Sequence, residues 1–186
     1  MLARGSREQD RFVGRLAREE NGYVVMTGVD RDKPIIRLAE PRDAERIASV
    51  LSTSFIQHES SYTPQAYEAT VPDSEQIVHR LSEGPVWVAV RASEVVGTVS
   101  VVHKGDALYI RSMAVVPAAR AHRLGESLLR QVESFAAEHG YARLVLSTTP
   151  FLNSAIRLYQ NFGFRRNEAE PHDLFGTPLF TMEKIL

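Results

Sequence analysis

The sequence predicts a mixed α/β fold in which a largely antiparallel, twisted sheet is flanked by helices. In the middle of the chain, apolar strand-like segments are joined by short turns, which predicts an antiparallel meander. Two segments with helical spacing follow, and the short apolar strand between them is compatible with a parallel crossover. At 186 residues, 44% of them hydrophobic and 24% charged, the chain is long enough for one well-packed domain.

The first half of the chain contains two helix signals. Pro41 suits the first turn of a helix, where its missing N–H is no loss, and a short strand is expected before it at 35–38. A polar stretch follows, and Asp73 and Gln76 have the spacing of a capping box that opens a helix ending at Gly84. Residues 1–33 are highly charged, so we expect a poorly ordered or loosely attached N-terminal extension before a domain at 34–186.

The second half alternates strands and helices. Gly140 and Gly163 are natural helix stops, so each helix is expected to end there. The expected strands cover 85–90, 95–102, 107–115, 143–147 and 178–185, and the expected helices cover 124–139 and 153–162.

Composition excludes several classes of protein. The chain has no cysteine, which removes disulfides and thiol nucleophiles and fits a reducing cytoplasm, where we expect the protein to act. Its formal charge of −1 argues against nucleic acid as a partner. We expect no membrane span, because no run of 18 apolar residues occurs, and the N-terminus does not resemble a signal peptide. The six histidines lack metal-ligand spacing, so no metal site is expected.

The segment at 110–139 predicts an anion site. A strand leads through a basic turn into a helix, and the first N–H groups of a helix lack internal partners and attract phosphate. Arg120, His122 and Arg123 add positive charge to this turn, and Gly125 is expected to let a ligand approach the backbone closely.

Two motifs give this segment a family context. Residues 115–125 read VVPAARAHRLG, and residues 155–164 read AIRLYQNFGF. Together they resemble the GCN5-related N-acetyltransferase (GNAT) superfamily, whose patterns are V-x-P-x-x-[QR]-x-x-G-x-[GA] and A-x-x-L-Y-x-x-x-G-F. The resemblance covers about residues 35–186. It implies a GNAT fold, in which two central parallel strands splay apart, here 107–115 and 143–148.

The resemblance also implies a function, which is the transfer of an acetyl group from acetyl-CoA (coenzyme A) to a primary amine in a ternary complex. Tyr159 matches the family tyrosine that protonates the departing thiolate, and its phenol is protonated at neutral pH. The Val115 amide is the candidate donor to the oxyanion. The residues implied in acetyl-CoA binding are Met113, Ala114, Val115, Arg120, Ala121, His122, Arg123, Leu124, Gly125, Glu126 and Asn153.

The sequence departs from the family pattern at two positions. Arg123 occupies a slot where glycine is usual, so its side chain either hinders the approach of the pyrophosphate or donates hydrogen bonds to it. Asn153 stands one residue later than the asparagine that often contacts the cofactor, and its simpler role is that of a helix N-cap.

The general base and the acceptor stay open. The central strands carry no Asp or Glu, and substitutes are His58, Glu59, His172, Asp173 or a water chain. The resemblance also implies that the acceptor site lies between residues 55–73 and 171–178. There Glu59, Glu68 and Asp73 either favour a cationic amine or are ordinary surface charges. A homodimer also stays open. The alternative function is a non-catalytic acyl-CoA-binding sensor or interaction module.

Overall fold

A computed structural model describes residues 33–167 and 172–186, and in them it confirms the expected mixed α/β fold class. Residues 1–32 lie outside this described part, so the expected N-terminal extension stays a prediction. The strands are β1 (Ile35–Leu38), β2 (Val86–Arg91), β3 (Glu94–Lys104), β4 (Ala107–Val115), β5 (Arg143–Thr148), β6 (Arg165–Arg166), β7 (His172–Leu174) and β8 (Thr177–Ile185). The helices are α1 (Ala44–Phe55), α2 (Pro64–Thr70), α3 (Ser74–Glu83), α4 (Leu124–Glu138) and α5 (Asn153–Asn161).

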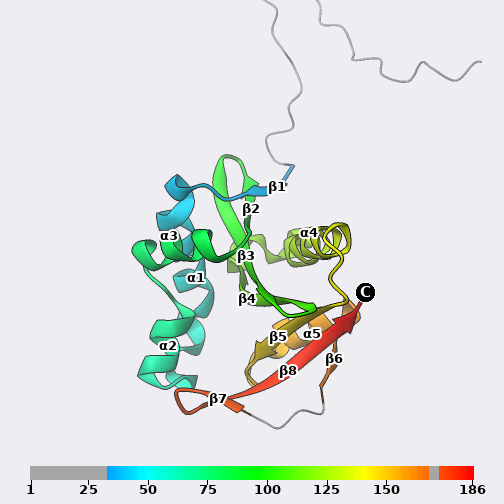
Figure 1. Cartoon of the computed structure of the whole chain (residues 1–186). Coiled ribbons are helices and arrows are strands. Elements are labelled where there is room, and N and C mark those ends of the chain that lie inside the picture. Colours follow the sequence, from blue (N-terminus) through cyan, green and yellow to red (C-terminus); the bar gives the residue numbers. More distant parts are fainter. Residues whose placement is uncertain (1–32, 168–171) are drawn as a thin grey trace, which may run out of the picture. The chain divides into compact units, whose positions relative to one another are not determined.

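The sheet follows the order β1-β2-β3-β4-β5-β8-β6 within the described residues, and β7 pairs with β8 at its side (Figure 1). The expected meander is confirmed, because β2, β3 and β4 pair antiparallel in succession. β4 and β5 then pair parallel through the α4 crossover. The β2–β3 link needs only Ala92 and Ser93, both at positive φ (48° and 70°), which matches the twist of the two strands.

Helices cover both faces of the sheet. On one face α1 and α3 pack on β2–β4 around a buried group that includes Ile47, Leu51 and Val88. On the other face α4 and α5 pack in a larger buried group that includes Leu128 and Leu146. The alternation of side chains along each strand separates these two cores. In β2, for example, Val88 belongs to the first core, whereas its neighbour Trp87 belongs to the second.

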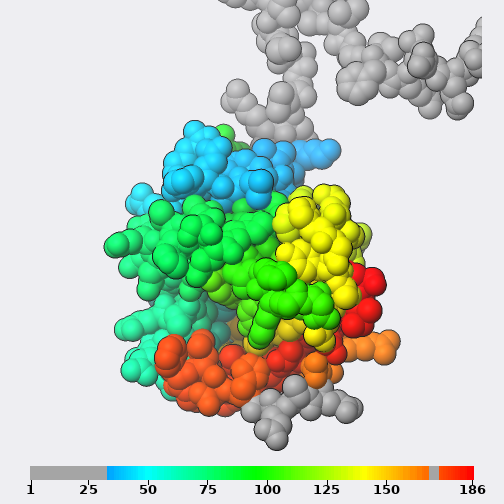
Figure 2. All heavy atoms as spheres, viewed as in Figure 1, coloured from blue at the N-terminus to red at the C-terminus, as the bar shows by residue number. Residues whose placement is uncertain are grey.

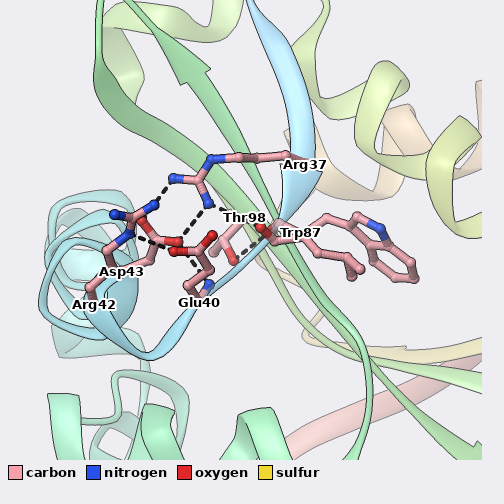
Figure 3. Close-up of polar contacts among 7 residues, drawn as sticks. Arg37, Glu40, Arg42, Asp43, Trp87 and Thr98 are labelled. Atoms are coloured by element: carbon pink, nitrogen blue, oxygen red, sulfur yellow. Dashed lines mark hydrogen bonds and ion pairs between the residues drawn. The ribbon is translucent and has the colours of Figure 1, made fainter.

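A partly buried ion pair joins β1 to the start of α1 (Figure 3). The Asp43 carboxylate is 1% exposed and receives two hydrogen bonds from the Arg37 guanidinium, at 2.7 and 2.9 Å. It also accepts the backbone N–H of Glu40 at 2.8 Å. These donors hold the pKa of Asp43 well below its usual value, at about 2, because they stabilise the charged form.

The sequence correctly predicted the start of α3 but not the helices that directly precede it. The Asp73 and Gln76 capping box is present, with Gln76 N–H to Asp73 Oδ1 at 2.8 Å. The polar stretch before α3, for which no helix was predicted, contains a 3₁₀ helix at Ile56–Ser61 and the helix α2. Thr63 caps α2, since its Oγ1 accepts the N–H of Ala66 at 3.3 Å.

Candidate active site

The pairing between the parallel strands β4 and β5 stops partway along them. Their register runs from Ala107 opposite Arg143 to Ile110 opposite Leu146. β4 continues to Val115 and β5 to Thr148, but beyond Ile110 the two strands no longer pair. The splay implied by the family resemblance therefore begins at residue 111.

A β-bulge in β4 accounts for this separation. On the β3 side, Ser100 faces Ser112 and Val101 faces Ile110, which leaves Arg111 as an extra residue. A bulge bends its strand and increases the local twist, so β4 turns away from β5 directly after Ile110. Sequence reasoning missed the bulge because it is defined by pairing with another strand and not by the residue types around position 111.

Beyond the bulge, β4 presents backbone polar groups on its open side. Val116 N–H donates to Val96 O at 3.0 Å, toward β3. Because successive residues of a strand direct their N–H and C=O to opposite sides, Ala114 also faces β3, whereas Met113 and Val115 face the gap left by β5. Arg120 Nε donates to Val115 O at 3.3 Å, so this side chain lies over part of the open edge.

The basic turn follows this edge directly. A 3₁₀ helix at Pro117–His122 ends at Arg123, whose φ of 53° and ψ of 25° are left-handed, and α4 begins immediately after it. Ser127 N–H donates to Arg123 O at 3.1 Å as the helix starts. The N–H groups of the three residues between them belong to the first helical turn, at the positive end of the helix dipole.

The basic side chains of the turn are accessible. Arg120, His122 and Arg123 are all exposed, as is Ala121, while Glu126 is half-buried. His122 Nε2 lies 2.8 Å from Nη1 of Arg91, at the end of β2. Exposed cations beside the start of a helix form an environment that favours a phosphate group.

Gly125 has a packing role in the fold, beside the expected role in ligand approach, which stays a prediction. A Cβ at this position would lie 2.8 Å from Leu158 Cδ2 and 3.5 Å from Met113 Cε. The glycine thus allows α4 to approach α5 and β4 closely. Leu124, its neighbour, is buried in the core and anchors the first turn of α4.

Tyr159 lies in the last turn of α5, with 8% of its surface exposed, and packs against Phe164. Burial raises the pKa of its phenol above the ordinary value, and the nearby phenols Tyr62 and Tyr109 raise it further. Tyr109 lies on β4 just before the bulge, and Tyr62 comes from the segment after α1. Tyr159 is therefore close to the point where the central strands part, and Tyr109 is a neighbour that sequence reasoning missed.

Asn153 is the first residue of α5, and the N-cap is Leu152, so the expected capping role of Asn153 is wrong. Its side-chain amide donates to Phe151 O at 3.4 Å, and the residue is exposed. Phe151 in turn packs edge-on against Tyr62, with ring centroids 4.9 Å apart.

The two segments expected to line the acceptor site do meet. Thr63 N–H donates to Thr177 Oγ1 at 2.9 Å, and Thr63 Oγ1 donates to Phe175 O at 2.8 Å, although the partners are more than 100 residues apart. Figure 2 shows a hollow on this face, between the teal surface of α2, the green surface of β3–β4 and the orange-red surface of β7 and β8.

The four candidate bases have different surroundings, and Glu59 is exposed on the 3₁₀ helix at Ile56–Ser61. Asp173 is engaged in a turn, where its Oδ1 accepts Gly176 N–H at 2.7 Å. His58 packs against the ring of Phe151. His172 Nε2 lies 3.1 Å from Oγ of Ser147, which follows the last β5 residue paired with β4. Within the described residues, no cluster of three or more His, Asp or Glu side chains could hold a metal ion.

The comparisons with known proteins agree with this geometry. The sequence model described as "Acetyltransferase (GNAT) family" matches residues 46–164, which is well over half of the chain. The chain belongs to the acetyltransferase (GNAT) family.

Two relatives and one fold neighbour illustrate the range of GNAT proteins similar to this chain. N-acetylaspartate synthetase of Danio rerio is 31% identical over 128 residues, 67% of this chain. The chain spans only 45% of that relative's length. The uncharacterized N-acetyltransferase YjgM of Escherichia coli is 26% identical over 145 residues, covering 75% of this chain and 86% of YjgM. PaiA N-acetyltransferase from Thermoplasma acidophilum, solved in complex with coenzyme A, has the same fold, with a TM-score of 0.72 at 16% identity over 83% of this chain and 99% of that one.

Proposed function

We propose that this protein transfers an acetyl group from acetyl-CoA to a primary amine that attacks the thioester directly while both are bound. The observation that carries the proposal is the continuous path from the open β4 edge at Met113 and Val115 into the first turn of α4. A strand edge suits the amide groups of the pantetheine arm, and a helix N-terminus suits the diphosphate. Membership of the GNAT family and the coenzyme A complex of the PaiA fold neighbour support the same cosubstrate.

In this proposal each part of the path has its own role. The Val115 N–H, directed into the gap, donates to the carbonyl oxygen as negative charge develops there. The amides from Ala121 to Glu126 hold the diphosphate, and Arg123 donates to it instead of blocking it. Arg120 leaves Val115 O when the pantetheine arm pairs with the strand. Asn153, exposed at the start of α5, contributes only at the margin of this cofactor site.

Proton transfer needs an acid and a base. Tyr159 supplies the proton to the leaving thiolate, because its raised pKa keeps the phenol protonated throughout the neutral range. We propose His172 as the group that removes the proton from the amine, since its ring contacts β5 through Ser147 beside the gap.

We also infer that the protein works in the cytoplasm, which its lack of cysteine supports. In the described residues, no helix is long and apolar enough to cross a membrane.

The experiment that tests the proposal compares wild type with Tyr159→Phe in thiol release from acetyl-CoA and in acetyl-CoA affinity measured by calorimetry. We expect kcat to fall by about 100-fold while affinity stays within about twofold, because the phenol acts only as charge develops on sulfur. The wild-type rate should also not fall as pH rises toward 10, since the Tyr159 phenol stays protonated above its ordinary range.

The matched control is Tyr141→Phe, which removes a half-buried phenol between α4 and β5. We expect this control to retain the wild-type rate. Equal rates for the wild type and Tyr159→Phe would refute the acid role. Binding of acetyl-CoA without release of thiol, for every amine offered, would favour the non-catalytic acyl-CoA sensor instead.

A further inference from the structure

The β4 bulge places an arginine at the vertex of the splay. Arg111 follows Ile110, the last β4 residue that pairs with β5, and it is the extra residue of the bulge. Its neighbour Ser112 accepts a hydrogen bond from Arg80 of α3, and Arg111 itself bonds to Glu83 at the end of α3, so these two side chains lie on the α3 side of the sheet. Tyr109, whose phenol contributes to the raised pKa of Tyr159, is two residues earlier on the same strand.

Only one of the three guanidinium nitrogens of Arg111 has a hydrogen-bond partner among the described residues. Its Nη1 bonds to the Glu83 carboxylate at the end of α3. Its Nε and Nη2 are enclosed and have no hydrogen-bond partner among the described residues. These two nitrogens form one edge of the guanidinium, and their parallel N–H groups match the two oxygens of a carboxylate. Enclosed charged donors without an acceptor are costly, so this edge is suited to a ligand that supplies one.

A second arginine lies beside the first. Arg80 donates to Ser112 Oγ at 3.0 Å and to Ala69 O at 3.1 Å. Burial lowers the pKa of Arg80, and the charge of Arg111 lowers it further, which indicates that the two guanidinium groups are close. One open hollow is lined by both arginines together with Gln76, His79 and Glu83. With two guanidinium groups against one carboxylate, this hollow is positively charged.

The acidic residues considered for a cationic amine do not form a comparable cluster. The Asp73 carboxylate caps α3 through the N–H of Gln76. Glu68 is exposed on α2. Glu59 lies near Tyr67, since burial raises the pKa of the Tyr67 phenol and the charge of Glu59 raises it further. The strongest charge arrangement beside the gap is therefore the arginine pair and not a set of carboxylates.

We propose that the acceptor amine carries a carboxylate, which binds along the Nε–Nη2 edge of Arg111 with Arg80 beside it. This inference rests on the proposed acetyl transfer and names its acceptor class. Because the edge is enclosed in the ligand-free protein, binding requires a side-chain movement that opens it. Arg111 lies two residues after Tyr109, the β4 phenol that raises the pKa of Tyr159, so a short amine bound in this way lies beside the strand that forms the proposed cofactor site.

The test compares acceptors that differ only in the acidic group, namely L-alanine with L-alaninamide and glycine with glycinamide, by thiol release from acetyl-CoA. We expect the carboxylates to be the better acceptors by about 10- to 100-fold in kcat/KM, since each uncharged analogue loses hydrogen bonds to a charged group. Arg111→Gln should abolish this preference without changing acetyl-CoA affinity. Arg111→Lys should restore only part of it, because it keeps the charge but not the paired donors. The control Arg46→Gln, on the exposed side of α1, should match wild type.

A second measurement does not depend on turnover. The Arg111 Nε–H resonance should shift on titration with N-acetylglycine, a product-like carboxylate, and should not shift with N-acetylglycinamide. Turnover of glycinamide at least as fast as glycine, with the ratio unaffected by Arg111→Gln, would overturn the carboxylate proposal but leave acetyl transfer intact. If no amine led to thiol release, that result would instead count against the proposed function. If, in addition, the Arg111 resonance did not shift with N-acetylglycine, the carboxylate site would be overturned as well.

Discussion

Arg123 combines two properties that oppose each other. Its left-handed backbone, with φ at 53°, is the conformation that glycine adopts readily and other residues adopt at a cost. The side chain, however, is an exposed cation beside the first turn of α4. The sequence showed that a glycine slot was filled by arginine, but only the structure shows that the backbone there is left-handed.

Two substitutions separate the backbone effect from the charge effect at this position. Arg123→Ala removes the charge and keeps the strain, whereas Arg123→Gly removes both. We expect both variants to bind acetyl-CoA about tenfold more weakly, because each loses a charged donor to phosphate. Arg123→Gly should be more stable than Arg123→Ala by about 1 kcal/mol in urea denaturation. Unchanged affinity in both variants would contradict a phosphate role for the guanidinium.

Asp43 gives a pH-dependent prediction. Its folded-state pKa is depressed to about 2, from an ordinary value of 3.8. The stability it contributes is therefore fully present above about pH 5 and is lost as pH falls from about 4 to 2. We expect Asp43→Asn to lower the free energy of unfolding by about 2 kcal/mol at pH 7 and by much less at pH 2.

The control for this prediction is Asp106→Asn, which breaks an exposed ion pair with Arg143. That change should cost less than about 1 kcal/mol and should show a weaker pH dependence. A constant difference between wild type and Asp43→Asn from pH 7 to pH 2, in urea denaturation, would show that the ion pair is not the source of the stability.

At the scale of elements, Gly84 shows why α3 ends where it does. The sequence predicted a helix stop at this glycine, and α3 does end at Glu83. The reason is not a left-handed cap, because φ of Gly84 is 172°, an extended value open to any residue. A Cβ here would lie 2.2 Å from Val101 O, so the chain passes too close to the β3 backbone for any side chain.

We therefore expect Gly84→Ala to lower the free energy of unfolding by about 2 kcal/mol or more, because the backbone of β3 must move to admit the methyl group. Thermal and urea denaturation measure this. Gly125→Ala is the matched control, since its Cβ would meet only the flexible end of Leu158 and should cost clearly less. An equal or smaller loss for Gly84→Ala would mean that the close approach does not limit this position.

Local signals explain which elements the sequence predicted. The capping box at Asp73 and the helix starting at Leu124 depend on neighbouring residues, and both are present. The short helix α2 was missed, although Thr63 and Pro64 are a good helix start, because seven residues give too little apolar periodicity to detect. The bulge at Arg111 depends on pairing across strands, which no local pattern encodes.

For the whole molecule, the candidate site assembles from distant parts of the chain. The motifs at 115–125 and 155–164 pointed to the turn before α4 and to Tyr159 as candidate site residues, because each motif is continuous in sequence. The family resemblance implied that residues 55–73 and 171–178 lie near each other, but it did not predict their contact through Thr63 and Thr177. Neither the motifs nor the resemblance predicted that Arg80 lies close to Arg111. Side chains that meet through separate elements stay hidden until the fold is known.

The central claim is that the open edge of β4 and the first turn of α4 receive acetyl-CoA. Hydrogen–deuterium exchange of the full chain, with and without coenzyme A, tests it most directly. We predict slower amide exchange at Met113, Val115 and residues 121–126, and little change in β1 or at the end of α3. The account would be contradicted if calorimetry showed that coenzyme A binds, but saturating coenzyme A slowed amide exchange only outside these segments.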